Sequence, residues 1–181
     1  THRKTITDAL KLVRWPNLLM AALTMVLTRY AVIGSFYGEG GLVPLTTHLM
    51  FALLAGATVL VMAGGYIVND LYDLATDSIN KPQRQVIGKT FTQQSASNLY
   101  YVLTATGWLM GGVASWLIGR HEPALLIVLC TGLLYFYSVR YKRQPLVGNL
   151  VISVLGAMLI GIVWITELYN LLEHPEMMGA I

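Results

Sequence analysis

The residues best suited to chemistry in this sequence lie in one short polar segment, which contains Asn69, Asp70, Asp73 and Asp77. The segment directly follows an apolar stretch, so we continue the helix of that stretch through it at about 100° per residue. On that helix the amide and the three carboxylates occupy about a third of the circumference and are stacked over roughly 12 Å. The spacing therefore predicts one acidic face at the end of a helix.

An acidic face of this kind is unfavourable without a cation. Like charges three and four residues apart repel each other, and carboxylates at a membrane boundary lose hydration. Mg²⁺ prefers oxygen ligands and is usually held by one or two carboxylates together with the phosphate oxygens of a substrate. The face therefore predicts a site for a metal-bound phosphate group. The alternative interpretation is a solvated polar helix end just outside the membrane.

Two basic segments accompany the acidic face. Lys81 and Arg84 directly follow the acids, and Arg140 and Lys142 follow a later apolar stretch. A diphosphate that Mg²⁺ bridges to carboxylates needs positive charge on its remaining oxygens, and the Arg side chain offers two parallel donors for them. The acidic and basic segments together predict a site for a phosphate at the head of a lipid-soluble tail.

The elements that position these residues are five apolar stretches. Each is a candidate membrane span, because a helix needs about 20 apolar residues to cross the bilayer core. They run over residues 18–36, 49–68, 99–118, 124–139 and 146–165. The 181 residues are 55% hydrophobic and only 12% charged, which excludes a disordered chain and a nucleic-acid-binding tail. The single cysteine excludes an internal disulfide. We therefore expect an all-α fold, a polytopic transmembrane helical bundle with about five spans here.

The basic residues also orient the bundle. Ten of the twelve Lys and Arg residues precede the first stretch, or lie between the second and third or between the fourth and fifth. Positive residues gather on the cytoplasmic side. We therefore expect an integral membrane protein whose N-terminus and active-site loops are cytoplasmic, in the inner membrane of the cell if the source is bacterial. The simpler interpretation is that these clusters are topology signals alone.

Two further features of the apolar stretches lead to structural expectations. Arg29 lies in the outer half of the first stretch, and we expect its side chain to extend to the membrane interface. Gly107, Gly111, Gly112 and Ser115 in the third stretch are small enough to permit close contact between helices. The four histidines are scattered along the sequence and indicate no histidine metal site.

The acidic face and the second basic segment together resemble two motifs of the UbiA superfamily of intramembrane prenyltransferases. The first motif is Asn69-Asp70-x-x-Asp73-x-x-x-Asp77, followed by Ile79-Asn80-x-Pro82-x-Arg84, and the second is Tyr137-Ser138-x-x-Tyr141-Lys142-Arg143-x-Pro145-Leu146-x-Gly148-Asn149. The likeness covers essentially the whole chain. It implies a nine-helix membrane enzyme that transfers an isoprenoid from a prenyl diphosphate to an acceptor, with Mg²⁺ between the aspartates and the diphosphate.

The resemblance also implies roles for single residues. Asn69, Asp73 and Asp77 would hold Mg²⁺ and the diphosphate, with Asp70 beside them. The expected catalytic residues are Asp73, Asp77 and Lys142, of which Lys142 would stabilise the leaving group. The expected substrate-binding residues are Arg14, Asn17, Asp70, Lys81, Arg84, Tyr137 and Arg140.

The motif variant is most similar to the branch that attaches geranylgeranyl chains to geranylgeranylglycerol phosphate and to the chlorophyll synthase branch. The implied partners are a prenyl diphosphate, a lipid-like or aromatic hydrophobic acceptor and membrane lipids, with no nucleic acid and no protein partner inferred. The second aspartate cluster of the superfamily is missing, because no Asp follows Asp77. We therefore expect residues 1–181 to form a single membrane domain that is incomplete at its C-terminus.

Three other functions fit parts of the sequence. A non-catalytic membrane protein would bind prenyl or phospholipid headgroups through the basic segments alone. A small transporter would need charges near the membrane midplane, whereas the charges here cluster at one boundary. A CDP-alcohol phosphotransferase also uses paired acids on helices, but its Asp-Gly and Ala-Arg elements do not occur in this segment.

Overall fold

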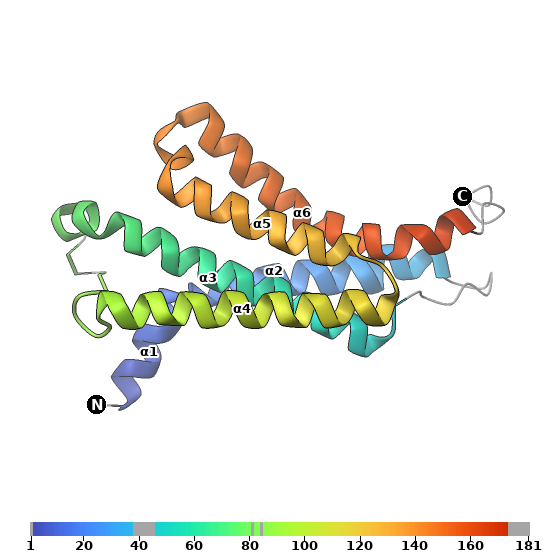
Figure 1. Ribbon diagram of the computed structural model, residues 1–181, viewed down its shortest axis with the longest axis horizontal. Coiled ribbons are helices and arrows are strands. Elements are labelled where there is room, and N and C mark those ends of the chain that lie inside the picture. The colour runs from blue at the N-terminus through green and yellow to red at the C-terminus, as the bar shows by residue number, and fades with distance from the viewer. Residues whose placement is uncertain (1, 38–45, 81, 84, 174–181) are drawn as a thin grey trace.

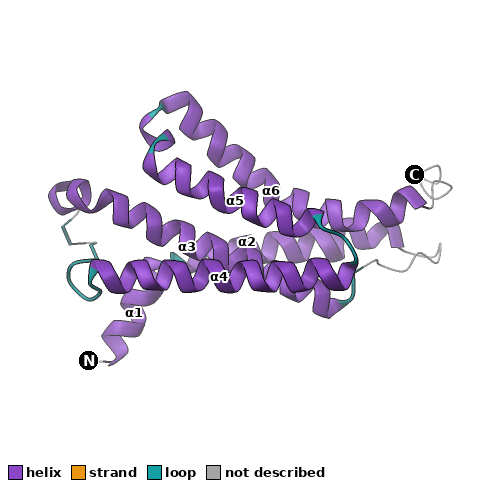
Figure 2. Ribbon diagram, viewed as in Figure 1, coloured by secondary structure: helices purple, strands orange, loops and turns teal. Residues whose placement is uncertain are grey.

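The computed structural model describes residues 2–37, 46–80, 82–83 and 85–173. These residues form helices and connections without a β-strand, as Figure 2 shows. In chain order the helical elements are α1 (His2–Leu12), α2 (Trp15–Leu27), the π-helical turn η1 (Thr28–Val32), the 3₁₀ turn η2 (Ile33–Tyr37), α3 (His48–Asn80), α4 (Gln93–Ile118), α5 (Glu122–Val139), the 3₁₀ turn η3 (Tyr141–Arg143) and α6 (Pro145–Glu173).

Five segments of the described chain are long and apolar enough to cross a membrane. They are Trp15–Ser35, His48–Asn80, Gln93–Ile118, Glu122–Val139 and Pro145–Glu167. The predicted all-α bundle with five spans is therefore confirmed, and the chain is an integral membrane protein. The predicted continuation of the second span is also present, because α3 runs without a break through all the acids to Asn80.

Local sequence explains where the helices begin and end. Pro16 and Pro123 occupy the first turns of α2 and α5, and α6 begins at Pro145. Proline suits these positions because its fixed φ fits a helix and its missing N–H has no partner there in any case. Thr92 caps α4 by accepting a hydrogen bond from the Ser95 backbone N–H at 3.1 Å, and α4 ends at Gly119 with φ +76°.

Close packing of α3 against α4 depends on small residues, as the sequence predicted. A Cβ at Gly107 would lie 3.1 Å from the Ala57 carbonyl oxygen, and a Cβ at Gly111 would lie 3.6 Å from the Ala57 Cβ. Ser115 is buried one turn further along. The expectation for Gly112 is wrong, because a Cβ at that position would have no heavy atom within 4 Å. One residue along an α-helix corresponds to a rotation of about 100°. Gly112 is exposed and therefore lies on the outer side of α4, whereas its neighbour Gly111 is buried.

Figure 1 shows that the N-terminus, the α3–α4 connection and the α5–α6 connection lie at one end of the bundle, which we call the polar end. A small buried cluster joins α1, α3, the α3–α4 connection and α4 at this end. It consists of Leu12 from α1, Ile67 from α3, Ile87 from the α3–α4 connection and Ala96 from α4, each at most 2% exposed. Apolar burial therefore holds α1 against α3, α4 and the connection between them.

The expectation for Arg29 is wrong. Its side chain is only 5% exposed and lies 3.8 Å from the Glu167 carboxylate, which is 1% exposed. Arg29 also donates hydrogen bonds to the carbonyl oxygens of Thr46 and Thr47, and its guanidinium carbon lies 4.8 Å from the centre of the Phe51 ring. A buried charge is stable only when it is paired and hydrogen-bonded. The acidic partner lies far along the sequence on α6, so the expectation of an interfacial side chain did not include it.

We predict that Arg29→Met destabilises the protein strongly, because it removes the cation that lies beside the buried Glu167 carboxylate. Removal of one member of a buried pair costs about 3–5 kcal/mol, whereas replacing both members by apolar residues is often neutral. The measurement is thermal unfolding in detergent. The double variant Arg29→Met/Glu167→Met is the control and should recover most of the loss. Equal melting of Arg29→Met and wild type would contradict the buried pair.

Candidate active site

The predicted acidic face is present at the end of α3. The Asn69 amide nitrogen donates to the Asp73 carboxylate at 3.2 Å, which is the contact that a four-residue helical spacing allows. All four residues of the face are half-buried. The face is divided by its partners, however, because Asn69 and Asp73 contact one cation and Asp70 contacts another.

Lys142 is the cation that contacts Asn69 and Asp73. Its ammonium donates to the Asn69 side-chain oxygen at 3.3 Å and forms an ion pair with the Asp73 carboxylate. The Lys142 and Asp73 side chains are 14% and 24% exposed, so the pair is shielded from solvent on most sides. Asn69 Oδ1 and Asp73 Oδ1 therefore converge on a single positive centre, which α5 and η3 bring to α3.

Arg14 is the cation that contacts Asp70. Its Nη2 lies 2.8 Å from the Asp70 carboxylate, and its guanidinium carbon lies 4.9 Å from the centre of the Tyr66 ring. Asn17 donates to the Tyr66 hydroxyl at 3.2 Å, so two of the predicted substrate-binding residues, Arg14 and Asn17, contact the same aromatic side chain. Arg14 has φ +53°, an uncommon left-handed conformation for a residue other than glycine, and it forms the break between α1 and α2.

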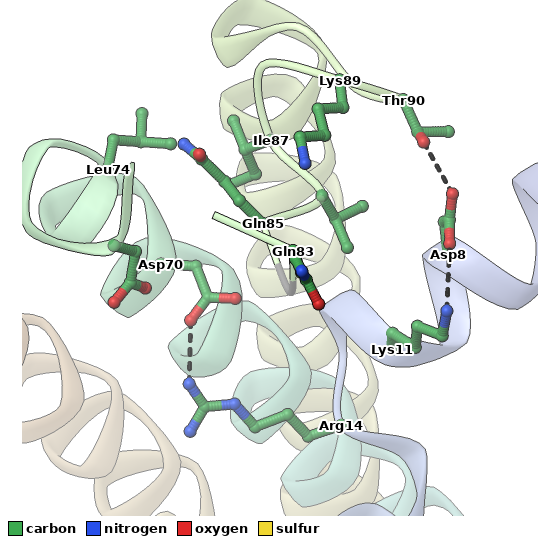
Figure 3. A pocket seen from close by; sticks show the side chains of 12 residues that line it. Asp8, Lys11, Arg14, Asp70, Leu74, Gln83, Gln85, Ile87, Lys89 and Thr90 are labelled. Atoms are coloured by element: carbon green, nitrogen blue, oxygen red, sulfur yellow. Dashed lines mark hydrogen bonds and ion pairs between the residues drawn. The ribbon is translucent and has the colours of Figure 1, made fainter. Parts of the chain in front are cut away.

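A polar cavity of about 850 Å³ lies beside the Arg14 side of the face. Asp70 and Asp77 line it from α3, and Figure 3 shows the Arg14–Asp70 ion pair at its wall. Its opposite wall comes from α1 and the α3–α4 connection. There Asp8 accepts hydrogen bonds from the Thr90 hydroxyl at 2.6 Å and from the Lys11 ammonium at 3.5 Å, as Figure 3 also shows.

A second, apolar cavity of about 230 Å³ lies between α3, α5 and α6. Val61, Leu134, Leu159 and Ile162 contribute to its lining. Tyr66 also lines this cavity, although its hydroxyl and ring contact the polar residues Asn17 and Arg14. Tyr66 therefore connects the polar end of the bundle with an apolar space inside it.

The structure brings together some of the predicted site residues and leaves others apart. Lys81 and Arg84 lie outside the described residues. Tyr137 is half-buried and Arg140 is exposed, and no hydrogen bond joins either of them to the acids of α3 in the described part of the chain. Their predicted role in substrate binding stays a prediction.

Sequence reasoning missed Tyr66, Asp8 and Thr90. Tyr66 lies four residues before Asp70, so helical spacing alone is enough to place it on the same face. Asp8 and Thr90 have no such signal, because their contact joins α1 to a connection that follows α3.

The donor atoms fit Mg²⁺ only with help from a substrate. Among the described residues, no three His, Cys, Asp or Glu side chains are arranged to hold a metal ion by themselves. Asn69 Oδ1 and Asp73 Oδ1 are hard oxygen donors that already converge on one positive charge. Such a partial set suits Mg²⁺, which takes one or two carboxylates and completes its shell with phosphate oxygens and water.

Known proteins match this chain over most of its length. The model of the UbiA prenyltransferase family matches residues 29–172. A digeranylgeranylglyceryl phosphate synthase of Hyperthermus butylicus is 35% identical over 148 residues, which are 80% of this chain and 45% of that protein. One of the same name from Ignicoccus hospitalis is 31% identical over 172 residues, which are 95% of this chain and 49% of that protein.

A solved structure has the same fold. It comes from work on the biosynthesis of digeranylgeranylglyceryl phosphate synthase in membranes, and it aligns with a TM-score of 0.75 at 21% identity. The alignment covers 90% of this chain and 53% of that one. The chain therefore spans about half the length of the relatives it matches.

Gly148 allows Lys142 to reach the acids. A Cβ at this position, in the first turn of α6, would lie 2.8 Å from the Tyr141 carbonyl oxygen and 3.3 Å from the Lys142 Cα. Both atoms belong to the backbone of η3, so they cannot move away as a flexible side chain would. The absent side chain of Gly148 thus allows α6 to pack directly on the turn that carries Lys142.

We predict that Gly148→Ala destabilises the polar end, because the added methyl group forces η3 away from α6. Overpacking of this kind costs about 1–3 kcal/mol. Gly161→Ala, on the same helix, is the matched control, since a Cβ there would have no heavy atom within 4 Å. That control should be neutral or stabilising by up to about 1 kcal/mol, because alanine favours a helix. Thermal unfolding compares the two variants, and equal stability would contradict the close contact.

Proposed function

The chain belongs to the UbiA prenyltransferase family, and from this premise we propose that it transfers a prenyl group, specifically geranylgeranyl, from its diphosphate to a lipid-like acceptor. The acceptor that fits best is geranylgeranylglycerol phosphate, because the relatives at 31% and 35% identity are both named digeranylgeranylglyceryl phosphate synthase. The observation that carries the proposal is the convergence of the Asn69 and Asp73 oxygens with the Lys142 ammonium at one end of an apolar bundle.

The reaction needs negative charge to be neutralised on the departing diphosphate. The bond between the allylic carbon and the diphosphate oxygen breaks, and the acceptor hydroxyl oxygen bonds to that carbon and releases its proton. Fixed cations lower the barrier by stabilising the charge that develops on the leaving oxygens. Lys142 and Arg14 form ion pairs with Asp73 and Asp70, at the two sides of the face.

We assign the metal of this reaction as Mg²⁺, with Asn69 and Asp73 as its nearest protein ligands. These residues would hold the ion, which would supply Lewis-acid stabilisation of the leaving oxygens. Asp77 is a predicted ligand in the same motif, but it lies on the side of the face that lines the polar cavity. Asp70 is engaged with Arg14, which supports a role beside the metal rather than on it.

The apolar cavity suits the tail of the prenyl substrate. It lies between α3, α5 and α6 and is lined almost wholly by apolar side chains. A dry cavity also keeps water away from the reactive allylic cation. Tyr66, which touches both the cavity and Arg14, would then lie near the junction of tail and diphosphate.

We propose the orientation that the basic residues favour, with the N-terminus and the polar end in the cytoplasm. The diphosphate would then arrive from the cytoplasm, while the apolar tails of both substrates would enter from the inner leaflet. A non-catalytic protein that binds prenyl or phospholipid headgroups is the alternative function, and it predicts binding without turnover.

We predict that Asp73→Asn abolishes Mg²⁺-dependent prenyl transfer or lowers it by about 10²-fold or more, the usual loss when one electrostatic contact to the transition state is removed. The assay uses the complete gene product in nanodiscs and radiolabelled geranylgeranyl diphosphate. The acceptor panel contains geranylgeranylglycerol phosphate, an aromatic acid, a quinone precursor and a chlorophyll-type ring.

Glu122→Gln is the matched control, because it makes the same acid-to-amide change at the opposite end of the bundle. It should retain transfer. Unchanged turnover in Asp73→Asn would refute the catalytic role of this face. Absence of transfer to every acceptor in the wild type, with headgroup binding retained, would favour the non-catalytic alternative.

A further inference from the structure

The Lys142 ammonium contacts both of the oxygens that would hold a metal ion at Asn69 and Asp73. It contacts Asn69 Oδ1 at 3.3 Å and Asp73 Oδ1 in an ion pair, and these are the two oxygens that converge at the polar end. The Asn69 amide nitrogen donates to the other carboxylate oxygen of Asp73 at 3.2 Å. The three side chains therefore form a closed ring in which both candidate ligand oxygens already have a cation.

A divalent ion and this ammonium compete for the two oxygens. Each oxygen has a second lone pair, but two positive charges on the same oxygens would repel each other at close range in a site that is mostly shielded from water. The Arg14–Asp70 pair does not present the same conflict. It engages a different carboxylate, and its side chains are more exposed, at 43% and 27%.

We propose that Lys142 is a stand-in cation, which occupies the metal position in the free protein and moves onto the diphosphate when metal and substrate bind together. This inference rests on the proposed function. The diphosphate supplies the negative oxygens that take over the ammonium, and Asn69 and Asp73 are then released for the metal. Metal binding and diphosphate binding are therefore coupled, and each strengthens the other by the same factor.

The local structure suits such an exchange of partners. Lys142 lies on η3, a 3₁₀ turn of three residues between α5 and α6, and its backbone is held by the close contact with Gly148. The four-carbon stem of lysine is flexible, and its ammonium is a compact charge that accepts new partners in many directions. The ammonium is thus able to move from the acids to a diphosphate while the backbone stays in place.

The stand-in role also explains how the acidic face is stable without metal. Like-charged carboxylates on one helix face repel each other. Lys142 and Arg14 each neutralise one of them, at the two sides of the acidic face. A free protein with this arrangement does not need a tightly bound ion to fold, so weak metal binding before substrate arrives is the expected state.

The test measures Mn²⁺ affinity by electron paramagnetic resonance on the complete gene product without substrate. Lys142→Met should bind Mn²⁺ at least about fivefold more tightly than wild type, the lower end of usual coupling between two sites. Lys142→Arg, which keeps the charge, should bind as weakly as wild type. Arg143→Met is the matched control, because it removes a positive charge from the neighbouring exposed residue of η3, and its Mn²⁺ affinity should equal that of wild type.

A second measurement covers the case in which Lys142→Met is too unstable for titration. The variant leaves Asp73 without its cation, so its melting temperature should fall without metal and should recover in Mn²⁺ by more than the wild type gains. Lys142→Gln, a polar neutral variant, should behave in the same way. Recovery no larger than that of the wild type would mean that Lys142 is only a structural contact, and would overturn the proposal.

The coupling itself is measured with a non-hydrolysable geranylgeranyl thiodiphosphate analogue, whose affinity is compared at zero and saturating Mg²⁺. Complex formation between metal and analogue in solution is the same for every variant, so it cancels in the comparison. Mg²⁺ should strengthen analogue binding by a larger factor in wild type than in Lys142→Met, and equal factors would overturn the stand-in role. Prenyl transfer by the wild type is measured separately. Its result tests the proposed function and does not test the stand-in role of Lys142.

Discussion

The electrostatic cost of placing three carboxylates on one face of a membrane helix is the constraint on which the polar end depends. Carboxylates at this position lose hydration and repel one another, so the fold must bring cations to them from elsewhere. Arg14 comes from the break between α1 and α2, and Lys142 comes from the turn between α5 and α6. The acidic face therefore requires that three separate parts of the chain meet at one end.

Apolar packing supplies the geometry that these charges need. The cluster around Ile67 and Ile87 holds α1, α3 and α4 together beside the polar cavity, which Ile87 also lines. The contact of Gly148 with η3 holds α6 against the turn that carries Lys142. Neither contact involves a charged side chain. Because burial of apolar surface has no directional requirement, it fixes the helix ends roughly, and the ion pairs then select one arrangement among those that remain.

Most of the fold and part of the site are predictable from the sequence, because both depend on local spacing. The apolar runs predicted the five spans, and helical periodicity placed Asn69 and Asp73 in contact. The contact of Lys142 with these residues depends on how α5 and α6 pack, which no local pattern specifies. The expectation for Arg29 failed for the same reason, since its acidic partner lies on the last helix.

The acidic face contacts a cation on each of its two sides, and this arrangement determines which metal ligands these helices can provide. Asn69 and Asp73 face η3, whereas Asp70 and Asp77 face the polar cavity beside α1. On a helix that turns by about 100° per residue, Asn69 lies to one side of Asp73, and Asp70 and Asp77 lie to the other side. The division therefore follows from the angular spread of the motif and from the cations on either side. A metal centre between Asn69 and Asp73 would then be open on the side away from α3, where the chain provides only Lys142 among the described contacts of these two residues. The oxygen ligands that complete such a centre must come from the substrate, from water or from other parts of the protein.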